Sequence, residues 1–574
     1  MAAPANAAPY SPTTRNSGTA SAAATCHACL TELCTPGSRR WQYPFTACRD
    51  CAGAAVQDSH KASCAACRAE AANPADRHFQ TDPRCAQCGP LLDLQLANGA
   101  SIACDRPGQN GSYAVAATLA LLRNGGIVAI KDGSGFELCC DARNPVAIAR
   151  LREQLGVRNR PLAIMAANSA SLAGEVQLTD TEIHWLNAPL RPIVQLERLP
   201  GSWLPHTLAP GLATLRVMLP QHALHYLLFH LAAGSPAGTG WLDKPQEMLL
   251  VMHGARSGDG AGHADNVLAR EQLGRIADAF LLHDWPYPLL GAADELRIRR
   301  DGSTHYLRSN TSPPPAATQT PTAAPAATAA EIDLILREHR HYGPVLGLVL
   351  GSYGAGNPDL GGTQLLRMDH GRIQSLGQLA GLPLAGADVV EQEPWRLAAA
   401  LLHQLQLGAE IPQRFAAAVG HELVSIRLDR DQTLPHSHQL GALLDAVAVL
   451  LGLGLQQRDA GELLQKLESL AEPSAALTAG WHIDAGNTLD FRPLFTRLLA
   501  AQDAKTGSSL LHATLAAGLS AWAAVTARAE GLDTIVLAGQ CWHDRHLEEA
   551  VIEHLRDAGF NVLYPHVSVY GQPA

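Results

Sequence analysis

The sequence predicts a multidomain α/β protein that begins with tandem four-cysteine zinc fingers. Three observations predict this fold class: the length of 574 residues, a regular series of Cys-x-x-Cys pairs near the N-terminus, and long stretches in which strand-like and helix-like segments alternate. At about 150 residues per domain, the length allows roughly three or four domains. A Pro/Ala-rich segment divides the alternating part into two units.

The cysteine pairs predict two metal modules within residues 25–92. Eight cysteines form two copies of the spacing C-x2-C-x15–20-C-x2-C, which is typical of structural zinc sites. This region has few large apolar side chains, so bound metal must supply its folding energy. A disulfide framework is the alternative, but a cytosolic chain disfavours it. The predicted ligands of two Zn²⁺ ions are Cys26, Cys29, Cys48 and Cys51 for the first, and Cys64, Cys67, Cys85 and Cys88 for the second.

The other five cysteines have no partner at metal-binding spacing. We expect each to be a small buried hydrophobic residue. They are Cys34, Cys104, Cys139, Cys140 and Cys541.

Charge and composition exclude several functional classes. The formal net charge is −10, and residues 1–110 carry nine Lys/Arg against eight Asp/Glu, so nucleic-acid binding is not expected. The longest apolar run, 443–455, is interrupted by Asp445, and no membrane helix is predicted. Residues 1–24 lack the hydrophobic segment of a secretory signal. We expect them to be a flexible tail and the protein to be cytoplasmic.

The alternating segments predict two further units, 112–308 and 331–574, joined by a Pro/Ala-rich linker at 309–330. The first unit is expected to have a helix at 113–123 and strands at 127–130, 192–196 and 247–252. The second is expected to have strands at 345–350 and 534–537, and apolar helices at 395–407 and 440–453.

Motifs in all three parts carry a resemblance to a known family. The zinc region contains RRWQYPFT at 39–46 and NPADRHF at 73–79. The second unit contains GIVAIK at 126–131, CDA at 140–142 and RPIV at 191–194. The third contains EPWR at 393–396, DAVA at 445–448 and VLAG at 536–539. In this order the motifs resemble the HypF family of hydrogenase maturation carbamoyltransferases, over about residues 25–570.

The resemblance implies a YrdC-like α/β domain followed by a truncated Kae1-like domain of the actin (ASKHA) type. It also implies a reaction in which carbamoyl phosphate and ATP give a carbamoyl-adenylate. The carbamoyl group then passes to the C-terminal cysteine of HypE, as a step in making the cyanide ligands of nickel–iron hydrogenases. The implied cofactors are ATP and Mg²⁺ in addition to zinc. The implied nucleotide or carbamoyl-adenylate ligands are Lys131, Arg160, Arg191 and Ser257.

The sequence departs from the family pattern where phosphate and metal should bind. The 24 residues ahead of the zinc region leave no room for the family's acylphosphatase-like domain, so we expect carbamate to come from elsewhere or the chemistry to be absent. The family's basic stretch corresponds to Leu155-Gly156-Val157, followed by Arg158 and Arg160. In the third unit the His-rich metal site and the C-terminal Asp are missing. The phosphate segments there become VLGS at 349–352 and AGQ at 538–540.

These departures leave three hypotheses. The first is an active HypF-type carbamoyltransferase. The second, which the altered sites favour, is a non-catalytic scaffold or regulator that binds a HypE-type protein, another maturation factor or a hydrogenase subunit. The third is a zinc-stabilised RNA-binding protein, which the acidic balance disfavours.

Histidines outside these motifs form weak patterns only. His222 and His225 share a helix face, and His230 lies nearby, but the sequence shows no carboxylate that completes a metal site. His339 and His341 have a spacing that splits across a helix, so a solvated helix end is expected there.

Overall fold

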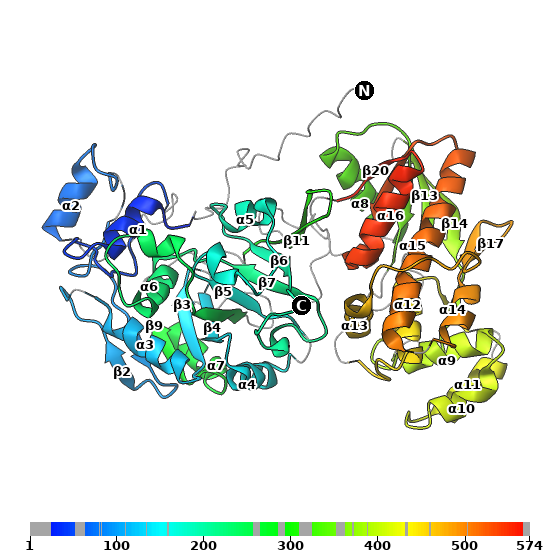
Figure 1. Ribbon diagram of the computed structural model, residues 1–574, viewed down its shortest axis with the longest axis horizontal. Coiled ribbons are helices and arrows are strands. Elements are labelled where there is room, and N and C mark those ends of the chain that lie inside the picture. The colour runs from blue at the N-terminus through cyan, green and yellow to red at the C-terminus, as the bar shows by residue number, and fades with distance from the viewer. Residues whose placement is uncertain are drawn as a thin grey trace.

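A computed structural model describes most of the chain. The described residues are 24–51, 64–79, 81, 83–109, 111–133, 135–157, 160–255, 265–284, 293–308, 324–351, 362–369, 372–386, 389–430, 434–457, 461–501 and 503–565. They form two α/β bodies that lie side by side (Figure 1), each built around one large β-sheet.

The first body contains an eleven-stranded mixed sheet. Short strands just after the zinc region pair with its edge, so residues 93–104 extend the sheet beyond the predicted unit. In sheet order the strands are β11 (Thr304–Arg308), β10 (Glu295–Ile298), β6 (Ile193–Glu197), β7 (Thr214–Met218), β5 (Ala163–Ala166), β8 (Leu249–Ala255), β4 (Gly135–Asp141), β3 (Val128–Asp132), β9 (Ala279–Leu282), β1 (Asp93–Gln95) and β2 (Ser101–Cys104).

Helices cover both faces of this sheet because its strands alternate two buried sets of side chains. Along β3, Val128 and Ile130 pack with α3 (Tyr113–Arg123) and α6 (Ala223–Ala232). Residues 127 and 129 face the other way, towards α4 and α7. Those helices are α4 (Pro145–Leu155) and α7 (Asn266–Leu273), and α5 (Asp180–Leu186) lies next to β6.

Local sequence explains where these helices begin and end. The side chain of Asn144 accepts hydrogen bonds from the Val146 and Ala147 amides, and Pro145 is the first helical residue of α4. Gly156 ends the helix with φ +70°, a conformation that glycine adopts without steric cost. Ser112 caps α3 in the same way by accepting from the Val115 amide.

The zinc region packs against α6. Its helices are α1 (His27–Cys34) and α2 (Ala65–Ala72). Leu30 and Leu33 of α1 join the same apolar cluster as α3 and α6. The Trp41 ring meets His230 edge-on at 5.4 Å, and the Gly238 amide donates to the Cys34 carbonyl at 2.8 Å. The metal modules are therefore anchored on the first α/β body.

The second body contains a seven-stranded sheet whose centre pairs β12 with β19 in parallel. In sheet order the strands are β17 (His482–Ile483), β18 (Thr488–Asp490), β14 (Arg372–Leu379), β13 (Gln364–Asp369), β12 (Val345–Val349), β19 (Thr534–Ala538) and β20 (Asn561–Leu563); β15 (Leu382–Pro383) pairs separately with β16 (His436–Ser437). The helices are α8 (Ala324–Glu338), α9 (Trp395–Gln404), α10 (Ile411–Arg414), α11 (His421–Arg430), α12 (Leu440–Leu450), α13 (Glu462–Leu470), α14 (Arg492–Leu498), α15 (Ala504–Ala529) and α16 (Arg545–Asp557).

The strands and helices expected from the sequence are present, with shifts at their ends. The helix expected at 395–407 ends at Gln404, and the one expected at 440–453 ends at Leu450. Helix α8 begins at Ala324, so regular structure starts inside the segment predicted to be a linker.

One helix of the described chain, α15, is long and apolar enough to cross a membrane by length and composition. The apolar run at 443–455 lies elsewhere, in α12 and the residues that follow it. Most of the apolar stretch of α15 is buried, and Leu511, Leu515 and Trp522 belong to the main core of the second body. This burial is typical of a core helix.

The two bodies meet through a buried ionic network. Arg297 of β10 and the nearby Arg299 both donate to the Glu548 carboxylate of α16, at 2.5 Å and 2.8 Å. All three side chains are buried. Tyr564, which follows β20, donates to Asp301 at 2.8 Å and stacks under the Arg299 guanidinium.

Candidate metal centres and nucleotide site

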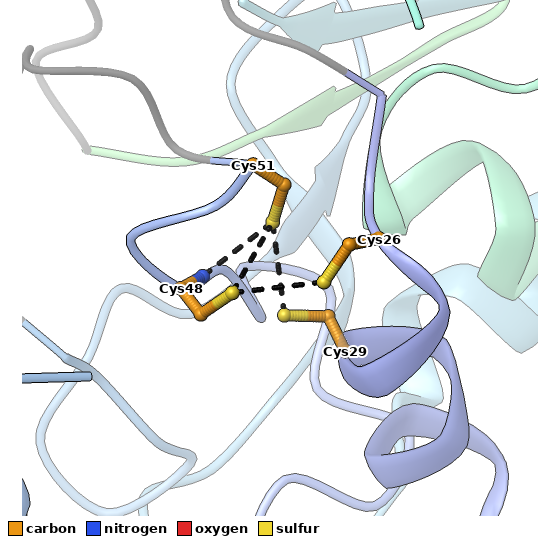
Figure 2. A group of neighbouring side chains, drawn as sticks. All are labelled: Cys26, Cys29, Cys48 and Cys51. Carbon is orange, nitrogen blue, oxygen red and sulfur yellow. Dashed lines mark hydrogen bonds between the residues drawn. The ribbon is translucent and has the colours of Figure 1, made fainter. Parts of the chain in front are cut away.

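The structure brings the eight predicted cysteines together as two separate clusters of four. In the first cluster, Cys26 precedes α1 and Cys29 lies in its first turn, while Cys48 and Cys51 come from a tight turn. Figure 2 shows the four sulfur atoms pointing towards one another. The Sγ–Sγ distances are 3.6 Å for Cys26–Cys48, 3.7 Å for Cys29–Cys51 and 3.9 Å for Cys48–Cys51.

The second cluster repeats this construction. Cys64 precedes α2 and Cys67 lies in its first turn, while Cys85 and Cys88 come from a turn closed by the Cys88 amide and the Cys85 carbonyl. The Sγ–Sγ distances are 3.9 Å for Cys64–Cys85 and 3.6 Å for Cys67–Cys88.

Both clusters fit zinc. Four sulfurs placed 2.3 Å from a tetrahedral Zn²⁺ lie about 3.8 Å from one another, which matches the distances in both clusters. The Cys67 backbone amide lowers the pKa of Cys64 to about 6, whereas burial raises the pKa of Cys67 and of Cys85, so the fit to zinc rests on the sulfur geometry. All eight are free cysteines, so the disulfide alternative receives no support.

Two arginines donate hydrogen bonds to the cysteine sulfurs, and these contacts were not predicted from the sequence. The guanidinium of Arg77 donates to Cys29 Sγ at 2.8 Å, and that of Arg39 donates to Cys67 Sγ at 2.5 Å. A four-thiolate zinc site carries a net charge of −2, and these cations offset part of it. The sequence signal was present, because both arginines lie within the motifs at 39–46 and 73–79.

Arg40 joins the two modules. Its side chain is 1% exposed and donates to Glu32 at 3.0 Å, to Glu70 at 2.5 Å and to the Arg84 carbonyl at 2.6 Å. Glu32 belongs to α1 and Glu70 to α2, so one buried guanidinium holds both helices. Such charge-assisted bonds fix the orientation of the modules as well as their position.

Lys131, a predicted nucleotide ligand, is buried at the end of β3. It is 8% exposed, and its ammonium donates to Asn266 Oδ1 at 2.7 Å and to the His283 carbonyl at 3.3 Å. Burial lowers the pKa of Lys131, although Asp265 and Asp284 act in the opposite direction. An ammonium has three N–H donors, and these two contacts use two of them.

The other predicted nucleotide ligands do not join Lys131 through any described contact. Arg191 has a positive φ of 49° and donates to the Leu186 carbonyl and to the Tyr226 hydroxyl, at 2.9 Å and 3.1 Å. It precedes β6, which is five strand spacings from β3, or roughly 24 Å along the sheet. Arg160 is half-buried just before β5, and Ser257 lies outside the described residues.

In the second body, β12 and β19 run parallel, and ligands of α/β sheets commonly bind beyond the carboxyl ends of such strands. The Leu350 amide donates to the Ala538 carbonyl at 2.8 Å, and the Cys541 thiol donates to the Gly351 carbonyl at 3.3 Å. Burial raises the pKa of Cys541 to about 12, so this thiol stays neutral. The described ends of the two strands are thus bonded to each other.

The backbone amide that follows β19 donates a hydrogen bond to a buried carboxylate. The Gly539 amide donates to Glu331 Oε1 of α8 at 2.9 Å, and Glu331 is only 4% exposed. Gly539 has φ +103°, and a Cβ at this position would lie 2.4 Å from the Leu350 carbonyl oxygen. The backbone amide at the end of the strand is therefore already hydrogen-bonded within the protein. The loosely glycine-rich segment at 352–361 lies outside the described residues.

The structure corrects two expectations about isolated residues. Cys104 is exposed on β2, whereas the other four cysteines predicted to be buried are buried. His225 does have carboxylates beside it: Asp132 from β3 and Glu137 from β4 offer oxygen atoms within 4.8 Å of its ring nitrogen and of each other. Sequence reasoning missed them because they lie about 90 residues earlier in the chain.

Three family models match the chain. The HypF finger matches residues 25–53, and the Sua5/YciO/YrdC family, described as telomere recombination, matches 120–291. The carbamoyltransferase Kae1-like domain, second subdomain, matches 351–570. These matches agree with a zinc-finger region, a YrdC-like domain and a Kae1-like domain in that order.

Full-length relatives and solved structures agree with this order. The chain is 32% identical to carbamoyltransferase HypF2 of Cupriavidus necator and 29% identical to carbamoyltransferase HypF of Rhodobacter capsulatus, in each case over 94% of this chain and 82% of the relative. The crystal structure of T. kodakarensis HypF superposes with a TM-score of 0.79 at 21% identity, covering 97% of this chain and 85% of that one, and shows the same fold. A full-length HypF in a phosphate- and nucleotide-bound form gives the same TM-score and identity over 95% and 83%. The chain belongs to the HypF carbamoyltransferase family.

Proposed function

We propose that this chain serves hydrogenase maturation as a HypF-type scaffold that binds a HypE-type maturation protein, without ATP-dependent carbamoyl chemistry of its own. Family membership supports the role in maturation. The bond between the Gly539 amide and the Glu331 carboxylate carries the second part of the proposal. Because the Gly539 N–H already donates to Glu331, this N–H is not open to a nucleotide phosphate, which would need a backbone donor at this position.

Charge strengthens this argument. A phosphate entering the edge formed by β12 and β19 would meet the buried carboxylate of Glu331 at short range, and like charges repel strongly away from bulk water. Catalysis of phosphoryl or carbamoyl activation needs the opposite arrangement, with cations or metal ions placed against the phosphates. The resemblance also implies a His-rich metal segment ahead of β12, where this sequence has the Pro/Ala-rich segment instead.

We also propose that each four-cysteine cluster holds one structural Zn²⁺. The sulfur geometry and the arginines against the sulfurs support this assignment. With all four positions of each site taken by cysteine, no coordination site remains for a substrate. The ions therefore stabilise the fold and keep α1 in place on α6, while Arg40 holds α2 to α1.

A combined activity and binding measurement tests the proposed function. Purified zinc-loaded protein is given ATP, Mg²⁺ and either carbamoyl phosphate or bicarbonate, and AMP release and pyrophosphate–ATP exchange are measured. We expect no exchange above a blank without protein, and a dissociation constant for a HypE-type protein of about 1 μM or tighter. Carbamate-dependent exchange would overturn the loss of chemistry, and the absence of binding would overturn the scaffold role.

Active carbamoyl-adenylate synthesis in the YrdC-like body is the second candidate, and Lys131 favours it. A buried ammonium already oriented by Asn266 and the His283 carbonyl is suited to holding an anionic group. Arg191, which lies five strand spacings from β3, would not belong to this site. Under this alternative, exchange is present in the wild type and is lost in Lys131→Met. The RNA-binding alternative gains no support from the net charge of −10.

A further inference from the structure

A group of metal-ligating side chains lies on the opposite side of the first sheet from Lys131. Along β3, Asp132 follows Lys131 and therefore points to the other face, with Val128 and Ile130. Glu137 of β4 points to the same face, and His225 reaches down from α6. One ligand atom from each of Asp132, Glu137 and His225 lies within 4.8 Å of the other two.

The histidine at the centre of this group is buried without hydrogen bonds. His225 is 1% exposed, and neither of its ring nitrogens makes a hydrogen bond to any described residue. Its Nε2 lies 3.2 Å from Asp132 Oδ2, but without the angles of a hydrogen bond. Buried polar groups are almost always satisfied, so an imidazole in this state indicates a missing ligand.

We infer that Asp132, Glu137 and His225 bind a divalent first-row metal ion, for which Mn²⁺ is the representative ion. Two carboxylate oxygens and one imidazole nitrogen form a mixed donor set suited to such an ion and distinct from the all-thiolate zinc clusters. Two carboxylates brought this close together repel each other, and a dication between them removes that repulsion. The half-buried His222, whose ring centroid lies 5.3 Å from that of His225, is a further imidazole at the edge of the site.

A similar group in the zinc region shows why this site differs. Glu70, Asp76 and His78 also lie within 4.8 Å of one another. There, however, the Nδ1 of His78 is hydrogen-bonded to Asp76 at 3.0 Å. Neither ring nitrogen of His225 has such a bond among the described residues, and this is the difference between the two groups.

The position of the site gives the ion a structural role in the first body. It would join β3 and β4 to α6, the helix on which the zinc region rests through Trp41 and His230. This inference is independent of the proposed function, because it concerns the face of the sheet away from Lys131. A protein with no carbamoyl chemistry would still bind the ion.

Mn²⁺ titration of the full-length, zinc-loaded chain tests the inference. The protein is first treated to remove loosely bound metal, and zinc content is checked so that the cysteine sites are known to be filled. Free Mn²⁺ is then followed by its electron paramagnetic resonance signal. We expect about one Mn²⁺ per chain, and binding weakened about tenfold or more in Asp132→Asn and in Glu137→Gln.

The variants are chosen so that folding does not confuse the result. Asp132→Asn and Glu137→Gln keep the size of the side chain, whereas His225→Ala would also leave a cavity. Asp243→Asn removes an exposed carboxylate of the same body and should bind Mn²⁺ as the wild type does. No Mn²⁺ binding by folded wild type, or equal affinity in Asp132→Asn, Glu137→Gln and Asp243→Asn, would overturn the inference.

Discussion

Asp445 shows how one residue can have opposite meanings in the sequence and in the structure. In the sequence it interrupts an apolar run, and in the structure it is a buried carboxyl group within α12. Gln457 donates to its Oδ2 at 3.0 Å, while its Oδ1 accepts no hydrogen bond from the described residues. Burial raises the pKa of Asp445 to about 7.

This raised pKa predicts a specific dependence of stability on pH. The unfolded carboxyl group titrates near pH 3.9, so between about pH 4 and pH 7 the native state holds a proton that the unfolded state has released. The contribution of Asp445 to the free energy of unfolding therefore falls as pH rises through this window. We expect Asp445→Asn to flatten this slope and to raise the unfolding midpoint of the second body at pH 8, corresponding to about 1–3 kcal/mol. Urea unfolding at pH 5 and pH 8 checks this, and an unchanged slope would contradict it.

At the scale of elements, each zinc module consists of the start of a short helix and a turn, which four cysteine sulfurs bring together. The eight-residue helices α1 and α2 are too short to be stable alone in water. The sulfur clusters tie each helix to a turn, and Arg40 ties the helices to each other. The modules should therefore lose structure when one thiolate is removed.

Replacing one cysteine tests this dependence. In Cys48→Ser we expect zinc content to fall from about two ions per chain to about one, because a hydroxyl group is a far poorer zinc ligand than a thiolate. Cys104→Ser is the matched control, since Cys104 is exposed and outside both clusters. Elemental analysis of the purified variants gives the answer. Retention of two zinc ions by Cys48→Ser would show that this cysteine is not a ligand.

At the scale of the whole molecule, Glu548 connects the two bodies. Its two carboxylate oxygens receive Arg297 and Arg299 from the first body, and all three groups are buried. These arginines hold the pKa of Glu548 below its usual value although burial acts to raise it. Buried ion pairs of this kind specify one relative orientation more than they add net stability.

Removing this charge should loosen the connection. Glu548→Gln leaves two buried guanidinium groups without a carboxylate, at a cost of about 3–5 kcal/mol. We expect calorimetry to show the unfolding of the two bodies at more widely separated temperatures than in the wild type. Glu553→Gln changes an exposed glutamate on the same helix and should leave the profile unchanged. A single unaltered transition in Glu548→Gln would show that the interface does not depend on this network.

The features that depend on local spacing could be predicted from the sequence. Cys-x-x-Cys turns, the helix at 113–123 and the strand at 534–537 each follow from residues close together in the chain, and the motif order was enough to identify the family. The end of the predicted linker could not be placed, because α8 begins within a Pro/Ala-rich segment whose composition resembles that of a coil.

The sequence by itself determined the zinc modules, the family and the order of the α/β bodies, because short-range chemistry encodes them. Only the tertiary structure decided which distant side chains meet. Glu331 reaches the amide of Gly539 across 208 residues, and His225 meets Asp132 and Glu137 because α6 packs on the face of β3 and β4. Strand order and the face on which each helix packs create these meetings, and both arise from burying apolar surface over the whole molecule rather than from any local pattern.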